Sequence, residues 1–211
     1  MSELNSGDLF FEELHDQANL VPETQQNTID HKIVIDEHIK RTSYVIIQHL
    51  RNVVSFQDKV KMPWGYHSRF IERLLHPEDK LIYKGKSQAL FNDMNLARRK
   101  EHIVPMNYLM YELWRLIEED NHTDQELSSL LQSHLGIAYI TQDEAKRLDG
   151  KETGLKCAMP TGWHLGVDDP LDRLKAIGIV LFNDNGQEVK TLINVSVHDK
   201  FHRTLILSGF C

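Results

Sequence analysis

Residues 105–119 carry the apolar pattern that most limits what this chain can fold into. Pro105 suits the first turn of a helix, where its missing N–H is not needed. Apolar residues then recur at three- and four-residue steps, which predicts an amphipathic helix that ends near Glu119. These residues are Met106, Leu109, Leu113, Leu116 and Ile117, and Met110, Tyr111 and Trp114 widen the apolar face. We expect this helix to be heavily buried.

Four further helices and two short strands are predicted around it. Helical spacing of apolar residues covers residues 36–58, 69–75 and 123–135. Residues 80–86 favour a short strand and turn, and residues 137–140 favour a compact strand. The strand at 137–140 leads into a short helix at 141–148.

The last third of the chain changes character. Glycine and proline mark loops over residues 150–176, and residues 177–208 favour three antiparallel strands with a turn at Asn185-Gly186. We therefore expect an α+β protein, whose helical N-terminal two-thirds contain a small sheet and whose C-terminal part is an antiparallel β-meander. Residues 1–31 are expected to form an acidic flexible leader. Residues 32–211 are expected to form a single domain, mainly helical over 32–149 and a loop plus meander over 150–211.

The formal charge of -7 is concentrated in that leader. Residues 1–31 contain seven acidic residues and no Lys or Arg, so residues 32–211 are neutral overall. The leader thus does not exclude a nucleic-acid partner. A dedicated DNA-binding domain, however, usually shows a clear basic excess, which the body of this chain lacks.

Several protein classes are disfavoured by simple absences. No apolar run approaches the roughly 18–20 residues that a membrane span needs, and the N-terminus lacks the pattern of a signal peptide. Two cysteines, Cys157 and Cys211, cannot build a disulfide framework. The chain contains no phosphate-binding glycine loop, no Gly-x-Ser-x-Gly turn and no dinucleotide fingerprint. We expect a cytoplasmic protein with no membrane partner.

Chemistry-bearing residues gather in one stretch, residues 98–105. A basic run, Arg98-Arg99-Lys100, precedes Glu101 and His102. The cations would attract phosphates, the Glu101 carboxylate could bind a divalent metal ion, and His102 could accept a proton from water. These are the parts of a site that cleaves phosphodiester bonds.

The string Glu101-His102-Ile103-Val104-Pro105 also resembles the first motif of the HNH (ββα-metal) nucleases, which often reads Asp/Glu-His-Ile-x-Pro. The resemblance implies a metal-dependent endonuclease in which His102 is the general base and Glu101 holds Mg²⁺ or Mn²⁺. In that family a short helix after a strand carries the last metal ligand. Here the candidates are Asp143 and Glu144.

Glu144 has a second interpretation. It stands three residues after Thr141, which is the signature of a capping box at the start of a helix. In that case its carboxylate binds backbone rather than metal.

Nucleic acid, most simply DNA, is the partner that the nuclease hypothesis implies. The phosphate contacts would come from Arg98, Arg99 and Lys100, with Lys84 and Lys86 nearby in the sequence.

The alternative hypothesis is a non-catalytic, protein-binding module with a regulatory or inhibitory role. It would hold its partner through the acidic leader, through the loop around Trp163 or through the C-terminal hairpin. Trp163 could instead cover the core. The two hypotheses differ in one geometric respect: a nuclease site requires Glu101, His102 and Glu144 to face one another.

Overall fold

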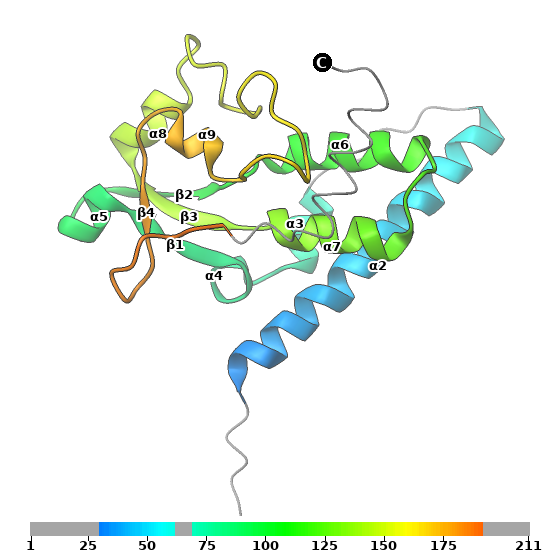
Figure 1. Ribbon diagram of the computed structural model, residues 1–211, viewed down its shortest axis with the longest axis horizontal. Helices are drawn as coiled ribbons and strands as arrows, with labels where there is room; N and C mark the ends of the chain where they lie inside the picture. Colours follow the sequence, from blue (N-terminus) through cyan, green and yellow to red (C-terminus); the bar gives the residue numbers. More distant parts are fainter. Residues whose placement is uncertain (1–29, 62–68, 192–211) are drawn as a thin grey trace, which may run out of the picture. The chain divides into compact units, whose positions relative to one another are not determined.

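The computed structural model describes residues 30–61 and 69–191 (Figure 1). The chain divides into two units, residues 1–34 and 35–211, and the second contains the sheet and nearly all of the helical residues described. Among the described residues, no helix is both long and apolar enough to cross a membrane. The helices are α2 His31–Val60, α3 Arg69–Leu74, α4 Glu78–Leu81, α5 Gln88–Asn92, α6 Met106–Glu118, α7 Asp124–His134, α8 Gln142–Leu148 and α9 Asp172–Lys175. The strands are β1 Tyr83–Ser87, β2 Arg98–His102, β3 Ile137–Thr141 and β4 Leu181–Phe182.

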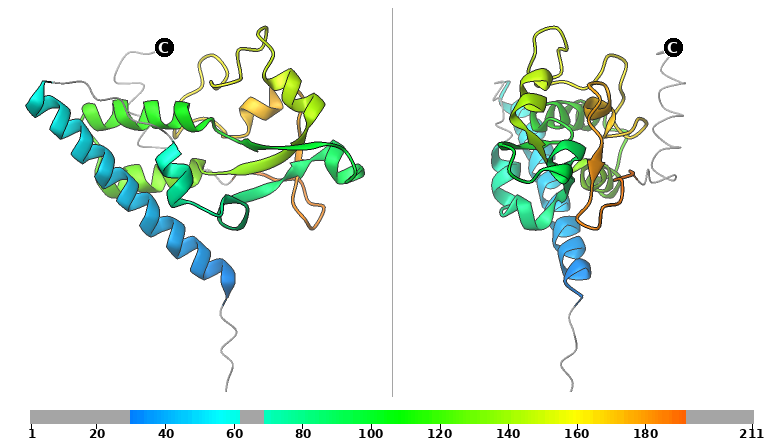
Figure 2. Two further views of the ribbon diagram at one scale, coloured as in Figure 1. Left: turned by 180° about the vertical axis from the view of Figure 1, so that it is seen from behind. Right: turned by 90° about the vertical axis from the view of Figure 1, so that its left-hand side faces the viewer.

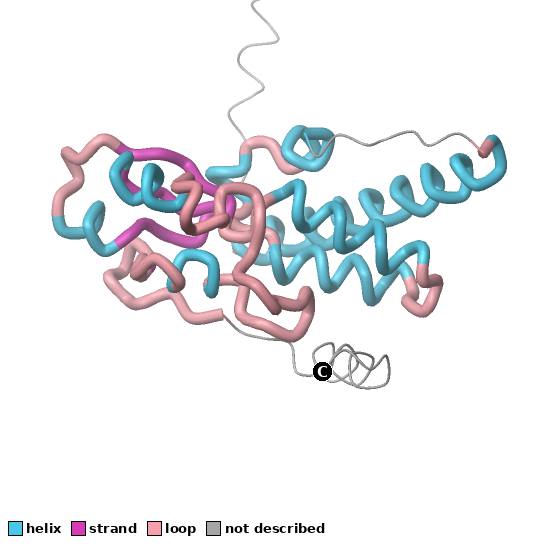
Figure 3. Tube along the Cα trace, turned by 90° about the horizontal axis from the view of Figure 1, so that it is seen from above, coloured by secondary structure: helices cyan, strands magenta, loops and turns pink. Residues whose placement is uncertain are grey.

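Three of these helices, α2, α6 and α7, supply most of the larger apolar core. Leu50 of α2, Leu109 and Leu113 of α6 and Leu130 of α7 are fully buried there. Burying a leucine side chain contributes roughly 1.5–3 kcal/mol. The helix predicted from Pro105 is confirmed, since α6 begins directly after that residue. In Figure 3 these helices lie to one side and the strands to the other.

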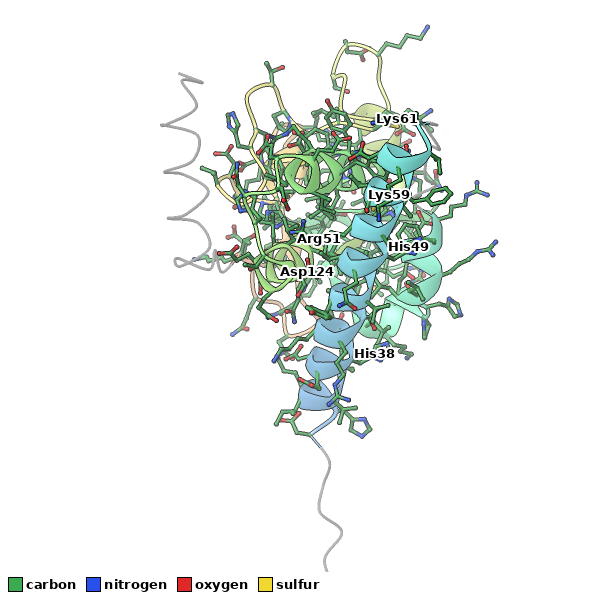
Figure 4. The ribbon with its side chains drawn as sticks, turned by 90° about the vertical axis from the view of Figure 1, so that its right-hand side faces the viewer. His38, His49, Arg51, Lys59, Lys61 and Asp124 are labelled. Atoms are coloured by element: carbon green, nitrogen blue, oxygen red, sulfur yellow. The ribbon has the colours of Figure 1, made fainter. Side chains whose placement is uncertain are left out.

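A polar contact joins α2 to the loop between α6 and α7. The guanidinium of Arg51 donates to the carboxylates of Asp124 and Asp120 and to the carbonyl of His122. Figure 4 shows Arg51 pointing from α2 toward Asp124 at the start of α7, whereas His38 and His49 are exposed. The helical part is therefore held by this polar clamp in addition to its core.

The strands form one mixed sheet in the order β2-β3-β1-β4. β1 and β3 are parallel neighbours, while β4 is antiparallel to β1 and β2 is antiparallel to β3. In the chain, α6 and α7 lie between β2 and β3. In the view from behind, β2 leads on into α6 (Figure 2).

The two faces of this sheet have different surroundings. Ala138 and Ile140 of β3 point to one face and pack with Ala145 and Leu148 of α8, in a second apolar core that also includes residues of α9. We call this the covered face, and Figure 1 shows α8 and α9 on that side. Alternate residues of β2 and β3 point to the opposite side, which we call the open face.

Close contact at the β1–β4 pair requires a glycine. A Cβ atom at Gly85 would lie 2.4 Å from the backbone oxygen of Phe182. A side chain at this position would separate β4 from the sheet.

The predicted mixture of helices and a small sheet is confirmed, with differences in several elements. Helix α5 was not predicted, and the strand expected from Ile177 is present only as β4, Leu181–Phe182. Residues 98–102 form strand β2, which the sequence did not predict, and residues 78–81 form helix α4 where a strand was expected from residue 80. The predicted turn before Gly186 is present. Gly186 has a φ of 75°, and its N–H donates a hydrogen bond to the carbonyl of Asn183. Most of the predicted meander, from residue 192 onward, and nearly all of the acidic leader lie outside the described residues.

Candidate functional site

Strand β2 places the chemistry-bearing run on two different faces of the sheet. It lies at the edge of the sheet and pairs residue by residue with β3, from Arg98 opposite Thr141 to His102 opposite Ile137. Successive side chains of a strand point to opposite faces. Arg99 and Glu101 therefore belong to the covered face, and Arg98, Lys100 and His102 belong to the open face.

Glu101 lies in a chain of alternating charges on the covered face. Its Oε1 accepts a hydrogen bond from Arg173 at 2.9 Å, and its Oε2 accepts one from Arg99 at 2.6 Å. Arg99 also binds Asp149 at 2.6 Å, which holds the pKa of that carboxyl below its usual range. Both carboxylate oxygens of Glu101 are thus occupied by guanidinium groups.

Arg173 is a residue whose importance the sequence did not reveal. It is the largest fully buried side chain among the described residues, and a buried arginine must have its donors satisfied. Besides Glu101, it donates to the carbonyls of His102 at 2.7 Å and Leu155 at 2.8 Å. It therefore ties α9 and the 155–156 loop to the end of β2. In the sequence, Arg173 is simply an arginine that precedes Leu174 in a short helical segment, and nothing there indicates that it is buried.

His102 and Lys100 share one carboxylate on the open face. Oε1 of Glu78 lies 3.0 Å from Nε2 of His102, and Oε2 accepts a hydrogen bond from Lys100 at 2.5 Å. Burial raises the pKa of Glu78, but the hydrogen bonds from Lys100 and His102 outweigh it and keep this pKa below its usual value. The three side chains form a closed group that joins α4 to β2.

The two other predicted metal ligands are engaged locally on α8. Glu144 is buried, its Oε2 accepts the N–H of Thr141 at 2.7 Å, and its own N–H donates to Thr141 Oγ1, which completes a capping box. Asp143 is exposed and forms an ion pair with Lys146 at 2.9 Å. The hydrogen bond from that cation lowers the pKa of Asp143.

The predicted metal ligands are therefore not brought together. Glu101 and His102 lie on opposite faces, and Glu144 is turned back onto its own helix start. Within residues 30–61 and 69–191, no three His, Cys, Asp or Glu side chains gather as a metal ion would require. The donor set at these positions does not fit the Mg²⁺ or Mn²⁺ ion that the resemblance implies.

A hollow of about 320 Å³ opens on the open face. That volume is at the lower end of the range for small-molecule sites. Two tyrosines on the parallel central strands, Tyr83 and Tyr139, line it with their ring centroids 6.0 Å apart. The other lining residues are Asp79, Lys86, Leu90, Met94, Arg98 and Asp184.

Among the described residues, no carboxylate forms an ion pair with Arg98, a cation that lines this hollow. Its guanidinium lies 4.7 Å from the ring centroid of Tyr139. Arg98 is exposed, as is the nearby Met94. The result is a planar cation layered on an aromatic ring at the surface.

Both tyrosine hydroxyls are turned toward acids. Tyr83 donates to Asp184 at 3.3 Å, and Tyr139 donates to Asp79 at 2.9 Å. Burial, followed by the charge of Asp184, raises the pKa of Tyr83 to about 12. The hydrogen bond to Asp79 raises the pKa of Tyr139. Both phenols are neutral at physiological pH and anchored by their oxygen atoms.

The five basic residues singled out in the sequence lie in three different places. Arg98, Lys100 and Lys86 lie on the open face, where Lys86 is 3.3 Å from Asp184. Arg99 is held in ion pairs on the covered face. Lys84 borders a different hollow, together with Gly136 and Pro170.

The loop around Trp163 presents no exposed tryptophan. Trp163 is buried, its Nε1 donates to the carbonyl of Asp169 at 3.0 Å, and its ring packs edge-on against Tyr108 and His134. The residue covers the larger core. A partner could not use this side chain without opening that core.

Comparison with known proteins adds no family to this description. The chain matches no protein-family model, no curated protein and no solved structure.

Proposed function

We propose that this protein is a non-catalytic module that binds single-stranded nucleic acid on the open face of its sheet. One observation carries the proposal: the hollow on that face combines two tyrosines on neighbouring strands with an exposed arginine layered on one of them. Aromatic rings and guanidinium planes are the surfaces on which proteins stack unpaired bases.

The two tyrosines are suited to stacking because their positions are fixed. Each ring rises from a central strand of the sheet, and each hydroxyl is held by an aspartate. A ring that is already ordered loses little conformational entropy when a base stacks on it. A base in the hollow would contact Tyr83 or the layered Arg98–Tyr139 pair.

Phosphates would be held by the cations at the rim. Arg98 has no carboxylate partner among the described residues to give up, and Lys86 is half-buried beside an exposed acid, Asp184. Two phosphate contacts predict a shallow salt dependence. For a single strand, the logarithm of the binding constant should fall by about 0.7 per phosphate contact for each tenfold rise in salt concentration.

A single strand fits these features better than a duplex. In a duplex the bases are paired and stacked on one another, so they cannot enter a hollow of this kind. Residues 32–211 are neutral overall, which gives little of the general attraction on which duplex binding depends. Stacking on a few aromatic rings does not need a large basic surface.

The partners of Glu101 and His102 support binding without cleavage. The Glu101 carboxylate is saturated by Arg99 and Arg173, and the imidazole of His102 is hydrogen-bonded to Glu78. Each residue has a structural role that accounts for it. The nuclease hypothesis becomes the rival outcome of the same experiment.

The test is the affinity of fluorescein-labelled single strands, measured by anisotropy for 12-nucleotide oligo-dT, its oligo-U counterpart and a duplex of the same length. Tyr139→Ala should weaken binding by about 1–3 kcal/mol, which is roughly 5- to 150-fold in Kd. Tyr111→Ala is the matched control, because Tyr111 is an exposed tyrosine on α6. Arg98→Ala should also weaken binding, and Arg147→Ala, an exposed arginine of α8, should not.

The same samples, incubated with Mg²⁺ or Mn²⁺, report on cleavage. Metal-dependent nicking that is lost in His102→Ala would replace this proposal by the nuclease. Absence of oligonucleotide binding would refute the proposal, and a protein partner would then be the function to examine.

A further inference from the structure

Two aspartates border the hollow, and they differ in what they bind. Asp184 is contacted at its Oδ1 by both Tyr83 and the cation Lys86, each at 3.3 Å, so a positive charge already lies against this carboxylate. Asp79 is exposed, and its Oδ1 accepts one hydrogen bond, from Tyr139 at 2.9 Å. No hydrogen bond from a described residue reaches its Oδ2. This carboxylate thus presents an acceptor oxygen beside the ring that Arg98 covers.

The neighbouring acid is excluded from this role. Glu78 is buried, and both of its oxygens are taken by Lys100 and His102. Of the two acids that follow each other at the start of α4, only Asp79 presents an acceptor to the hollow.

A carboxylate in this position discriminates among bases by hydrogen bonding. An ionised carboxylate only accepts hydrogen bonds, so it repels phosphate and binds N–H groups. Guanine presents two adjacent donors, its ring N1–H and its exocyclic amino group. One can donate to Oδ2 of Asp79 and the other to Oδ1, which accepts from Tyr139 and keeps a second lone pair. Uracil and thymine present one N–H between two carbonyl oxygens, and those oxygens would face the carboxylate unfavourably.

We infer that Asp79 selects guanine in the hollow on the open face. The inference rests on the proposed single-strand binding and adds its base preference. Guanine stacks against the Arg98–Tyr139 pair while its donor edge meets Asp79. The 2′-hydroxyl plays no part in this contact, so guanine in DNA and in RNA is recognised through the same chemistry.

The probes are 12-nucleotide oligo-dT, the same strand with guanine at a central position, and the same strand with inosine there. Inosine keeps the ring N–H and lacks the amino group. Guanine should tighten binding about tenfold over oligo-dT, and inosine should lose most of this gain. Asp79→Asn should lose the preference for guanine, measured as the ratio of its Kd for oligo-dT to its Kd for the strand with guanine, whatever its affinity for oligo-dT itself. Asp184→Asn is the matched control and should keep this preference.

The outcomes separate this inference from the one on which it rests. Binding of oligo-dT that depends on Tyr139 but shows no gain with guanine overturns the guanine inference alone. A guanine preference that survives in Asp79→Asn overturns the role of Asp79. Failure to bind any of the strands overturns both proposals. Uridine strands with and without one guanosine repeat the comparison in RNA, and a preference in only one of the two series contradicts the shared chemistry.

Discussion

Glu101 and His102 are neighbours in the chain, yet their side chains lie on opposite faces of the sheet. The Glu101 carboxylate binds the buried Arg173 at 2.9 Å, and the His102 imidazole lies 3.0 Å from Glu78. A strand imposes this separation on any two consecutive residues. In a loop, two consecutive side chains could point to the same side, as they must in order to bind one metal ion. The acid and the histidine thus serve two different parts of the fold.

Removing the Glu101 carboxylate should destabilise the protein strongly. Glu101→Ala leaves Arg173 buried without its charged partner, and breaking a buried pair in this way costs roughly 3–5 kcal/mol. The free energy of unfolding from urea titration measures the effect. His102→Ala is the comparison, because Glu78 keeps Lys100 as a partner, and its cost should stay near about 1 kcal/mol.

A second variant tests the cause of that loss. Replacing both residues, as Glu101→Leu with Arg173→Met, removes the buried charge together with its partner. This double variant should be more stable than Glu101→Ala. Equal losses for Glu101→Ala and His102→Ala would contradict the network described for the covered face.

Divalent metal ions should leave the stability unchanged. A site with a Kd of about 0.1 mM would raise the free energy of unfolding by about 2.7 kcal/mol when the metal concentration is about 100 times this Kd. That gain would raise Tm by several degrees. Since Glu101, His102 and Glu144 do not converge, we expect Tm to rise by less than about 1 °C in roughly 10 mM Mg²⁺ or Mn²⁺. A larger rise that Glu101→Gln abolishes would show that a metal site exists after all.

Glu144 should act on stability through its capping box. Glu144→Ala and Thr141→Ala should each cost about 1 kcal/mol, because either change leaves a backbone N–H at the start of α8 without its acceptor. Asp143→Ala, which removes an exposed acid from the same turn, should change the free energy of unfolding by less than about 0.5 kcal/mol. Urea titration distinguishes the three. If the loss of unfolding free energy in the Glu144→Ala, Thr141→Ala double variant equals the sum of the two single losses, the two residues do not act as a reciprocal pair.

Local signals in the sequence predicted much of this fold. The spacing of apolar residues after Pro105 predicted α6, and the Thr-x-x-Glu pattern predicted both the start of α8 and the hydrogen bonds of Glu144. These signals depend only on residues within one or two turns. Periodicity and capping are therefore visible without knowledge of the tertiary structure.

The candidate site could not be predicted in the same way. Strand β2 consists of Arg-Arg-Lys-Glu-His and has no apolar alternation, because its partners on both faces are charged side chains from distant parts of the chain. Arg173 is 72 positions from Glu101, and no local pattern reports that distance. The pairing of Tyr83 with Tyr139 arises from the parallel contact of β1 and β3, which requires the whole insertion between them to fold.

His134 should make the protein less stable as the pH falls below neutrality. Burial lowers the pKa of His134 to about 4, and its Nδ1 is hydrogen-bonded to the carbonyl of Leu130 at 2.8 Å. The unfolded chain binds the proton near pH 6.5, whereas the folded protein does not until about pH 4. Between these values the unfolded state holds more protons, so acid stabilises the unfolded state and lowers the free energy of unfolding.

The stabilisation from His134 is fully present above about pH 6.5 and should decline by up to roughly 3 kcal/mol as the pH falls toward 4. Urea titrations at several pH values, for the unaltered protein and for His134→Gln, isolate this contribution, because all other titrating groups are common to both. The difference in unfolding free energy between the two proteins should shrink as the pH decreases. A difference that stays constant over this range would mean that the imidazole of His134 takes up its proton as readily in the fold as in the unfolded chain.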